Sequence, residues 1–267
     1  VNPADICRSG KSHFQKTDTI DARLLCRELK SNRLRCICIP SLEREQLRCL
    51  FRRRNDLIKQ MRRIKTQLLM QLLYLGIAIP KEYDNPNWSH SFRTWIRSLE
   101  FDYSTMNSCL RSRMASFDFV DLHIRKVSTE LRAYCRKHYK KDYYLLRSVP
   151  GVGGIVACGI LSEIGDLRRF TNFKQLASYI GFVPSMRQSG DTIITTGVTP
   201  RANHLTRSYL VEATWVALRK DPVMQAYYRS HQGKDVKRIL IKVARKLLSR
   251  IHAVIRTETP YEIGVIS

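Results

Sequence analysis

Residues 41–76 read SLEREQLRCLFRRRNDLIKQMRRIKTQLLMQLLYLG, and this stretch decides the fold class of the chain. Its apolar residues recur three, four or seven positions apart, which is typical of a helix with a coiled-coil-like seam. The seam consists of Leu47, Leu50, Leu57, Met61, Ile64, Leu68 and Leu72. Ser41 can cap such a helix and Gly76 can end it. The stretch therefore predicts one long helix that buries a single stripe.

Most basic side chains of this helix lie off the seam. Such a charge run is often only a solvated helix face. Because few acids lie nearby here, a helix face that contacts nucleic acid is an equally good interpretation. The residues predicted to make that contact are Arg52, Lys59, Arg62 and Arg63.

The whole chain shares this charge, with 47 Lys and Arg against 23 Asp and Glu, a net charge of +24. Such an excess opposes a compact state unless a polyanion neutralises it, which indicates a nucleic-acid partner rather than merely a basic surface. The chain contains neither an apolar run of membrane-spanning length nor a signal-type opening. Its eight cysteines contain no CxxC pair, so we expect no zinc site. We predict a cytoplasmic protein.

Residues 1–40 are expected to hold a strand end at Val1-Asn2-Pro3, a basic loop and one helix capped by Thr17. The apolar run Cys36 to Pro40, CICIP, predicts a short strand that Pro40 stops.

Asp18 and Asp21 lie three positions apart at the start of this helix and would share a face. Two carboxylates so placed can hold Mg²⁺ together with water and phosphate oxygens. Alternatively, they only complement the helix dipole, which favours acids in a first turn.

The rest of the chain is expected to be helical. A turn-rich linker over residues 80–88 leads to helices whose Trp95, Ile96, Leu99 and Phe101 pack against the long helix. A final helix spans about Lys234 to Arg256. Its predicted inward residues are Val236, Ile239, Leu240, Val243, Leu247, Ile251 and Val254.

Residues 146–155, LRSVPGVGGI, look like a helix, a Pro-Gly turn and a second helix that opens with glycines. This pattern resembles a helix-hairpin-helix, in which Gly151 and Gly153 would let backbone N–H groups approach a DNA phosphate. The alternative is a tight turn between helices that binds nothing.

Residues 181–191, GFVPSMRQSGD, predict a polar loop in which Ser189 precedes Gly190. A serine there can be an exposed nucleophile if a base or metal activates it and cations bind the phosphate. The cations closest in sequence are Arg187, Arg201 and Arg207, and His204 is the nearest histidine. Most Ser-Gly pairs are ordinary turns, which is the competing explanation.

Taken in order, these motifs resemble the DEDD insertion-sequence transposases, and the similarity covers essentially the whole chain. The N-terminal matches are Val1-Asn2-Pro3 and Lys16-Thr17-Asp18-Thr19-Ile20-Asp21-Ala22-Arg23. The C-terminal matches are Ser148 to Gly153, Phe170, Leu176 to Pro184, Ser189-Gly190 and Thr199 to Leu205.

The resemblance implies a mainly α chain in three parts. Residues 1–40 would be the end of a RuvC-like α/β domain of the RNase H fold, and residues 41–140 a coiled-coil region. Residues 141–267 would be a mostly helical transposase domain.

The resemblance also implies four Mg²⁺-binding acids, of which Asp18 and Asp21 match the last two. Ser189 matches the serine that attacks DNA and forms a transient phosphoserine link. Asp18 and Ser189 lie far apart in sequence, so the fold or a partner subunit must bring them together. The implied partners are element and target DNA, a bridge RNA that pairs with both, and further copies of the chain in a dimer or tetramer.

The chain departs from the family pattern at two places. The first Asp and the Glu of the family lie before the Asn-Pro motif, so we expect a member truncated at its N-terminus. Ala202 also replaces a usual Gly, and Leu205-Thr206-Arg207 replaces the usual Leu-Arg. Two functions therefore stay open: a bacterial, nucleoid-associated transposase that cuts and rejoins DNA, or a catalytically incomplete remnant that binds nucleic acid. A helix-hairpin-helix repair protein would leave the first 140 residues unexplained.

Overall fold

The computed structural model describes residues 1–2, 6, 17–34, 36–83, 87–189, 192–199, 202–233 and 235–264, without the side chains of 186–189 and 192–196. The chain is mainly helical, as predicted, and forms two compact units, residues 1–42 and residues 43–267. None of the helices in the described part combines the length and the apolar character that a membrane span requires.

In the first unit, helix α1 spans Asp18–Lys30. Thr17 caps it as predicted, because its hydroxyl oxygen accepts a hydrogen bond from the Ile20 amide at 3.3 Å. Leu24 is buried, whereas Leu29 is 65% exposed. The apolar stripe of α1 is thus covered only in part within this unit.

The predicted strand over Cys36 to Pro40 is wrong, because these residues adopt no regular structure. Ile37 is 55% exposed and Ile39 is 83% exposed. A strand requires a neighbour for its backbone hydrogen bonds, and the described residues of this unit contain no second strand. Val1 and Asn2 are likewise not in a strand, and Pro3 lies outside the described residues.

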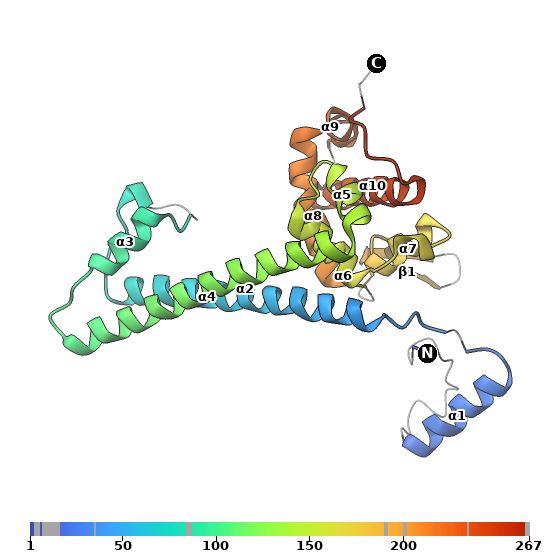
Figure 1. The fold of residues 1–267 in the computed structure, drawn as a ribbon, viewed down its shortest axis with the longest axis horizontal. Helices are drawn as coiled ribbons and strands as arrows, with labels where there is room; N and C mark the ends of the chain where they lie inside the picture. The colour runs from blue at the N-terminus through green and yellow to red at the C-terminus, as the bar shows by residue number, and fades with distance from the viewer. Residues whose placement is uncertain are drawn as a thin grey trace. The chain divides into compact units, whose positions relative to one another are not determined.

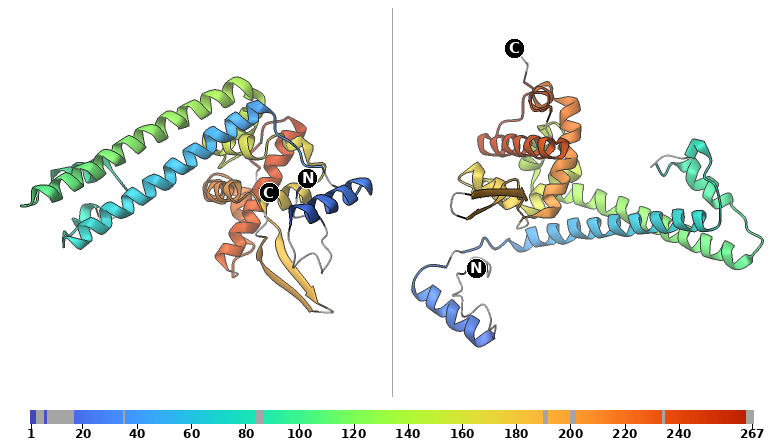
Figure 2. Two further views of the ribbon diagram at one scale, coloured as in Figure 1. Left: turned by 90° about the horizontal axis from the view of Figure 1, so that it is seen from below. Right: turned by 180° about the vertical axis from the view of Figure 1, so that it is seen from behind.

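The second unit begins with the predicted long helix, α2, which spans Leu42–Tyr74 and is followed by Gly76 at a φ of 67°. A 3₁₀ turn, η3 (Lys81–Tyr83), and α3 (His90–Ser98) lead to α4, which spans Ser104–His138. Helices α2 and α4 lie side by side in Figures 1 and 2. They run antiparallel, since the Tyr134 hydroxyl donates to the Glu43 carbonyl at one end and Arg113 donates to the Gln67 carbonyl further along.

The apolar seam of α2 is therefore covered by helices of the same chain. Leu57, Met61, Leu68 and Leu72 are buried in one cluster with apolar residues of α3 and α4. The predicted packing of the segment 95–101 is confirmed, because Ile96 is fully buried there and Trp95, Leu99 and Phe101 line the cluster.

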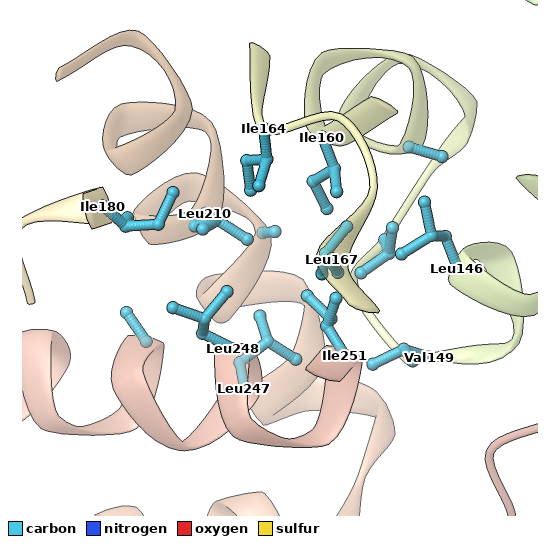
Figure 3. Close-up of a cluster of buried hydrophobic side chains, with 14 of the residues drawn as sticks. Leu146, Val149, Ile160, Ile164, Leu167, Ile180, Leu210, Leu247, Leu248 and Ile251 are labelled. Carbon is cyan, nitrogen blue, oxygen red and sulfur yellow. The ribbon is translucent and has the colours of Figure 1, made fainter. Parts of the chain in front are cut away.

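The C-terminal helices form a second cluster around α6, which spans Gly154–Glu163. The other members are α5 (Lys140–Ser148), η4 (Leu167–Arg169), α7 (Phe173–Ile180), α8 (His204–Lys220), α9 (Pro222–Arg229) and α10 (Val236–Thr257). Figure 3 shows side chains of α5, α6, α8 and α10 meeting in this core. Helix α2 also contributes Phe51 to this core. Its ring packs directly against Gly159 of α6, where an added Cβ would lie only 2.6 Å from the ring.

Helix α10 begins and ends within two residues of the predicted bounds. Its predicted inward residues are buried except Val236, which is 52% exposed and was wrongly assigned. Val236 is the first residue of α10, after the N-cap Asp235, and the buried stripe starts only at Ile239. The two strands of the unit, β1 (Pro184–Ser189) and β2 (Thr192–Val198), lie between α7 and α8.

Candidate functional site

The segment that carries Ser189 is one arm of a β-hairpin. The prediction of a loop is wrong for residues 184–189, because they form β1 and pair antiparallel with β2. β-Branched residues dominate β2, TIITTGV, which favours an extended strand. Ser189 pairs with Thr192, so it is the last residue of β1 before the two-residue connection 190–191.

Arg207 holds the base of this hairpin. Its guanidinium donates to the carbonyl oxygen of Gly181, before β1, at 3.2 Å and to that of Thr199, after β2, at 3.1 Å. It also contacts the His204 ring at 2.8 Å. Burial lowers the pKa of Arg207. Arg207 was predicted to contact a phosphate, but in the structure its guanidinium already binds two carbonyls of the protein.

The Arg187 side chain, Arg201 and Gly190 lie outside what the structure describes. The side chain of Ser189 does so as well, so the predicted nucleophile is placed by its backbone alone.

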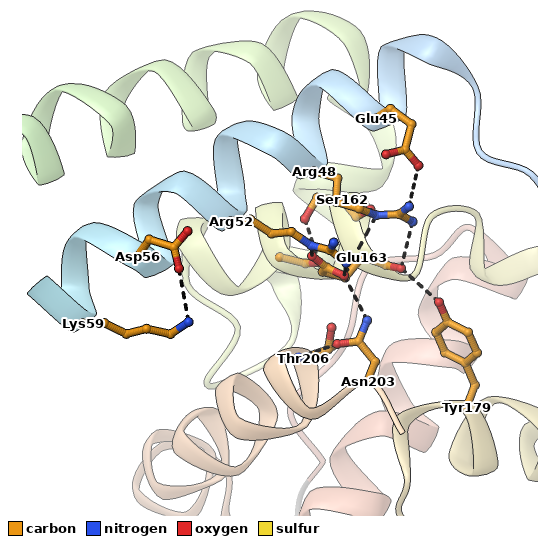
Figure 4. Close-up of polar contacts among 11 residues, drawn as sticks. Glu45, Arg48, Arg52, Asp56, Lys59, Ser162, Glu163, Tyr179, Asn203 and Thr206 are labelled. Carbon is orange, nitrogen blue, oxygen red and sulfur yellow. Dashed lines mark hydrogen bonds and ion pairs between the residues drawn. The ribbon is translucent and has the colours of Figure 1, made fainter. Parts of the chain in front are cut away.

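A buried carboxylate that the sequence interpretation missed contacts the segments before and after this hairpin. Glu163, the last residue of α6, is 2% exposed. It accepts two hydrogen bonds from Arg52 of α2, at 2.7 and 3.0 Å, and one from the amide of Asn203 at 3.0 Å (Figure 4). The Arg48 guanidinium donates to the neighbouring Ser162 carbonyl at 3.2 Å.

Hydrogen bonds decide the charge of Glu163. Burial alone would raise its pKa, but the hydrogen bonds from Arg52 and Asn203 outweigh that effect, so the pKa lies below its ordinary value. Correspondingly, the hydrogen bond to Glu163 raises the pKa of Arg52. The carboxylate is therefore charged and paired.

The same residue connects the helices on both sides of the hairpin. The Glu163 backbone carbonyl accepts from the Tyr179 hydroxyl of α7 at 3.2 Å. Asn203 caps α8, since its side-chain oxygen accepts from the Thr206 amide at 3.0 Å while its amide group donates to Glu163. Figure 4 shows α2, α6, α7 and α8 converging on this point. The arrangement positions the hairpin relative to the α2–α4 pair.

The basic residues predicted on α2 fall into two groups. Arg52 is bound by Glu163, and Lys59 forms an exposed ion pair with Asp56 at 3.1 Å. Arg62 and Arg63 are exposed, and neither side chain has an ion pair within the described part of the chain. Of the four, Arg62 and Arg63 are the ones without a competing acidic partner there.

The turn from α5 to α6 contains the predicted glycines, which differ in environment. Gly151 has a φ of 89°, and a Cβ there would come within 2.3 Å of the Ala213 carbonyl of α8. Gly153 is the N-cap residue of α6, and a Cβ there would meet nothing within 4 Å. Both line a groove of about 570 Å³ whose basic side chains are Arg147 and Lys220. Gly151 thus serves packing, and the N-terminus of α6 at Gly153 stays open to a ligand.

Asp18 and Asp21 lie in the first turn of α1, as predicted, with Asp18 exposed. Their carboxylate oxygens are ligands that Mg²⁺ accepts. Among the described residues no group of three or more His, Cys, Asp or Glu side chains is arranged to hold a metal ion. These two acids can supply part of a coordination shell but not all of it.

Two family models match the chain. The model of the "Transposase IS116/IS110/IS902 family" matches residues 143–229, which include the hairpin, Glu163 and the α5–α6 turn. A DEDD IS110 transposase model matches residues 1–75, which include Asp18, Asp21 and all of α2.

Curated proteins give the same result. A putative transposase, y4qE, of Sinorhizobium fredii is 27% identical over 75% of this chain and 47% of its own length. The transposase of insertion sequence element IS1111A from Coxiella burnetii is 23% identical over 76% of this chain and 55% of its own. A pilin gene-inverting protein of Moraxella bovis is 33% identical over 44% of this chain and 38% of its own. The chain thus spans about half the length of the relatives that it matches.

Proposed function

Because the chain belongs to the IS116/IS110/IS902 family of transposases, we propose that it cuts and rejoins DNA at the ends of an insertion sequence, with Ser189 as the nucleophile. The observation that carries this proposal is the position of Ser189. It is the last residue of β1 and pairs with Thr192 of β2, and Arg207 binds the carbonyls of Gly181 before β1 and Thr199 after β2. A nucleophile on a strand is held more precisely than one on a free loop.

The proposed reaction is an exchange of phosphoesters. The Ser189 hydroxyl loses its proton, and its Oγ forms a bond to a DNA phosphorus. The bond from that phosphorus to a deoxyribose oxygen breaks, and the leaving oxygen takes up a proton. A deoxyribose hydroxyl of the second DNA then attacks the phosphoserine, which frees Ser189 and joins the strands. Each step makes one phosphoester for the one it breaks, so no energy-rich cofactor is consumed.

We assign Mg²⁺ binding to Asp18 and Asp21, together with acids or phosphate oxygens from outside the described residues. Bound there, the ion would screen phosphate charge and lower the pKa of a hydroxyl. The support is the donor type and the three-residue spacing in the first turn of α1.

We assign nucleic-acid contacts to the open N-terminus of α6 at Gly153 and to Arg62 and Arg63 of α2, which form no ion pair with the described residues. A helix N-terminus offers N–H groups and a partial positive charge to phosphate. Arginines that contact phosphates increase the binding affinity by releasing counterions from the nucleic acid. Within the helix-hairpin-helix-like turn these contacts position DNA without reading sequence, and a bridge RNA paired to both DNAs would select the sites. A dimer or tetramer would hold the two DNAs together.

The test is a strand-exchange assay with the protein made from its native gene, the two element ends and the element's RNA. Ser189→Ala should abolish both cleavage and joining. The matched control is Ser178→Ala, an exposed serine of α7, which should retain full activity. Equal activity of Ser189→Ala and the unmodified protein would refute the nucleophile assignment. Salt-sensitive nucleic-acid binding without cleavage by either protein would favour the binding-only alternative.

A further inference from the structure

A pocket of about 420 Å³ lies between α8 and α9, away from the hairpin that carries Ser189. Its volume falls in the range of roughly 300–1,000 Å³ that is usual for sites of small ligands. Its lining residues are Trp215, Leu218, Arg219, Gln225, Tyr228, Arg229 and Gln232. Figure 1 shows α9 following α8 directly at this corner of the helical cluster.

The pocket is lined by a large exposed aromatic ring. Trp215 is 43% exposed, although a tryptophan ring stabilises a fold most when it is buried. Within the described part of the chain, its indole N–H has no hydrogen-bond partner, and its ring stacks on no other ring. Tyr228, from α9, is half-buried beside it in the same pocket. One face of this site is therefore aromatic and accessible.

The rim of the pocket is cationic. Arg219 lies one helical turn after Trp215, and Arg229 lies at the end of α9. Both are exposed, and within the described residues neither forms an ion pair. The side chains of Gln225 and Gln232, each able to donate and accept hydrogen bonds, complete the polar part of the lining.

The corner that shapes the pocket is held in place. Asp221, between α8 and α9, is 1% exposed. It accepts hydrogen bonds from the Val223 amide at 3.0 Å and the Tyr261 hydroxyl at 2.7 Å, and it pairs with Arg250 of α10. Because these contacts come from three segments, the site is formed before any ligand arrives.

We propose that this pocket binds one unpaired base of a single-stranded nucleic acid. The base would stack on Trp215, the glutamine amides would contact its edge, and Arg219 and Arg229 would bind the flanking phosphates. Aromatic rings combined with cations are the usual means of holding single strands, because every base has a stacking face. The net charge of +24 favours this polyanionic occupant over an apolar partner. The proposal goes beyond strand exchange and does not require Ser189 to be the nucleophile.

The test measures binding of the full chain to three labelled probes by fluorescence anisotropy at one fixed salt concentration. The probes are a thymidine DNA 12-mer, a uridine RNA 12-mer and a blunt DNA duplex. Trp215→Ala should weaken binding of at least one single strand roughly tenfold, and duplex binding less than twofold. Trp215→Phe should restore most of the loss. The larger loss, for DNA or for RNA, identifies which strand uses the pocket.

The matched control is Phe119→Ala, which removes a 59% exposed aromatic ring from α4, outside the pocket lining. It should leave all three affinities unchanged. Circular dichroism would verify that each variant is folded. Equal losses on single strands and duplex, or no loss with Trp215→Ala, would overturn the proposal. So would dissociation of an oligomer by Trp215→Ala, since the pocket would then be an interface between copies.

Discussion

At the scale of single residues, Glu163 illustrates how one buried charge organises this protein. Removing a carboxylate from water is unfavourable unless cations and hydrogen bonds compensate. Here Arg52 of α2 and Asn203, the N-cap residue of α8, provide the compensation. Glu163 therefore couples the α2–α4 pair to the segment that carries Ser189, as a positioning residue.

Replacing Glu163 by Gln should destabilise the protein by about 1–3 kcal/mol at pH 7, because Arg52 loses its charged acceptor. Thermal or denaturant unfolding measures this difference. The matched control is Asp56→Asn, which breaks the exposed ion pair with Lys59 on the same helix and should cost less than about 1 kcal/mol.

The same substitution carries a pH signature. Since the folded-state pKa of Glu163 is depressed, its stabilisation is fully present above the unfolded-state pKa of about 4.3 and is lost as pH falls through the lower folded-state value. The difference between the unmodified protein and Glu163→Gln should therefore shrink below about pH 4. A variant as stable as the unmodified protein at pH 7 would show that the contact contributes nothing.

At the scale of elements, the two glycines of the α5–α6 turn, which the sequence motif predicted to act alike, have different roles. Gly151 packs against α8, while Gly153 faces open space. An aspartate at an N-cap position stabilises a helix, and its charge would repel a phosphate at the same place. Substitution at Gly153 can therefore affect binding without harming the fold.

Gly153→Asp should leave the unfolding midpoint unchanged or slightly higher and should weaken DNA binding several-fold. Gly151→Ala is the contrasting variant. Its Cβ would clash with the Ala213 carbonyl at a φ of 89°, so it should lose about 1–3 kcal/mol of stability. Binding and unfolding are measured on both variants. Undiminished DNA affinity in Gly153→Asp would exclude a phosphate contact at this helix end.

Elements differed in how well the sequence predicted them. Helices α2 and α10 were predicted because a single buried stripe repeats along each of them. The polar sequence of residues 184–189 favours a loop, and the signal for a strand lies in its partner, the β-branched run that begins at Thr192. The opposite error occurred at Cys36 to Pro40, where an apolar run has no partner strand among the described residues of its unit.

The polar cluster was beyond sequence reasoning for a different reason. Glu163 lies 111 positions from Arg52 and 40 positions from Asn203 in the sequence. No local spacing of residues therefore predicts these contacts. A lone acid at the end of the apolar segment GIVACGILSE was the one available signal. An acid that ends a buried helix needs a cation, and the fold alone identifies which one.

At the scale of the whole molecule, the net charge and the similarity to transposases both favour nucleic acid as the proposed partner. The chain carries a net charge of +24, because its 47 Lys and Arg residues outnumber its 23 Asp and Glu residues. The two family models together include the acids of α1 and the hairpin of Ser189. In the proposed reaction, Ser189 becomes covalently attached to DNA.

The most direct measurement is a search for that attachment. The protein from its native gene is incubated with element-end DNA, the element's RNA and Mg²⁺, denatured, and digested with trypsin and nuclease. Cleavage after Arg187 and Arg201 yields a peptide, QSGDTIITTGVTPR, in which Ser189 is the only serine. We predict a nucleotide adduct on that serine by mass spectrometry. Strand exchange with no adduct there, or with the adduct on another residue, would contradict this account.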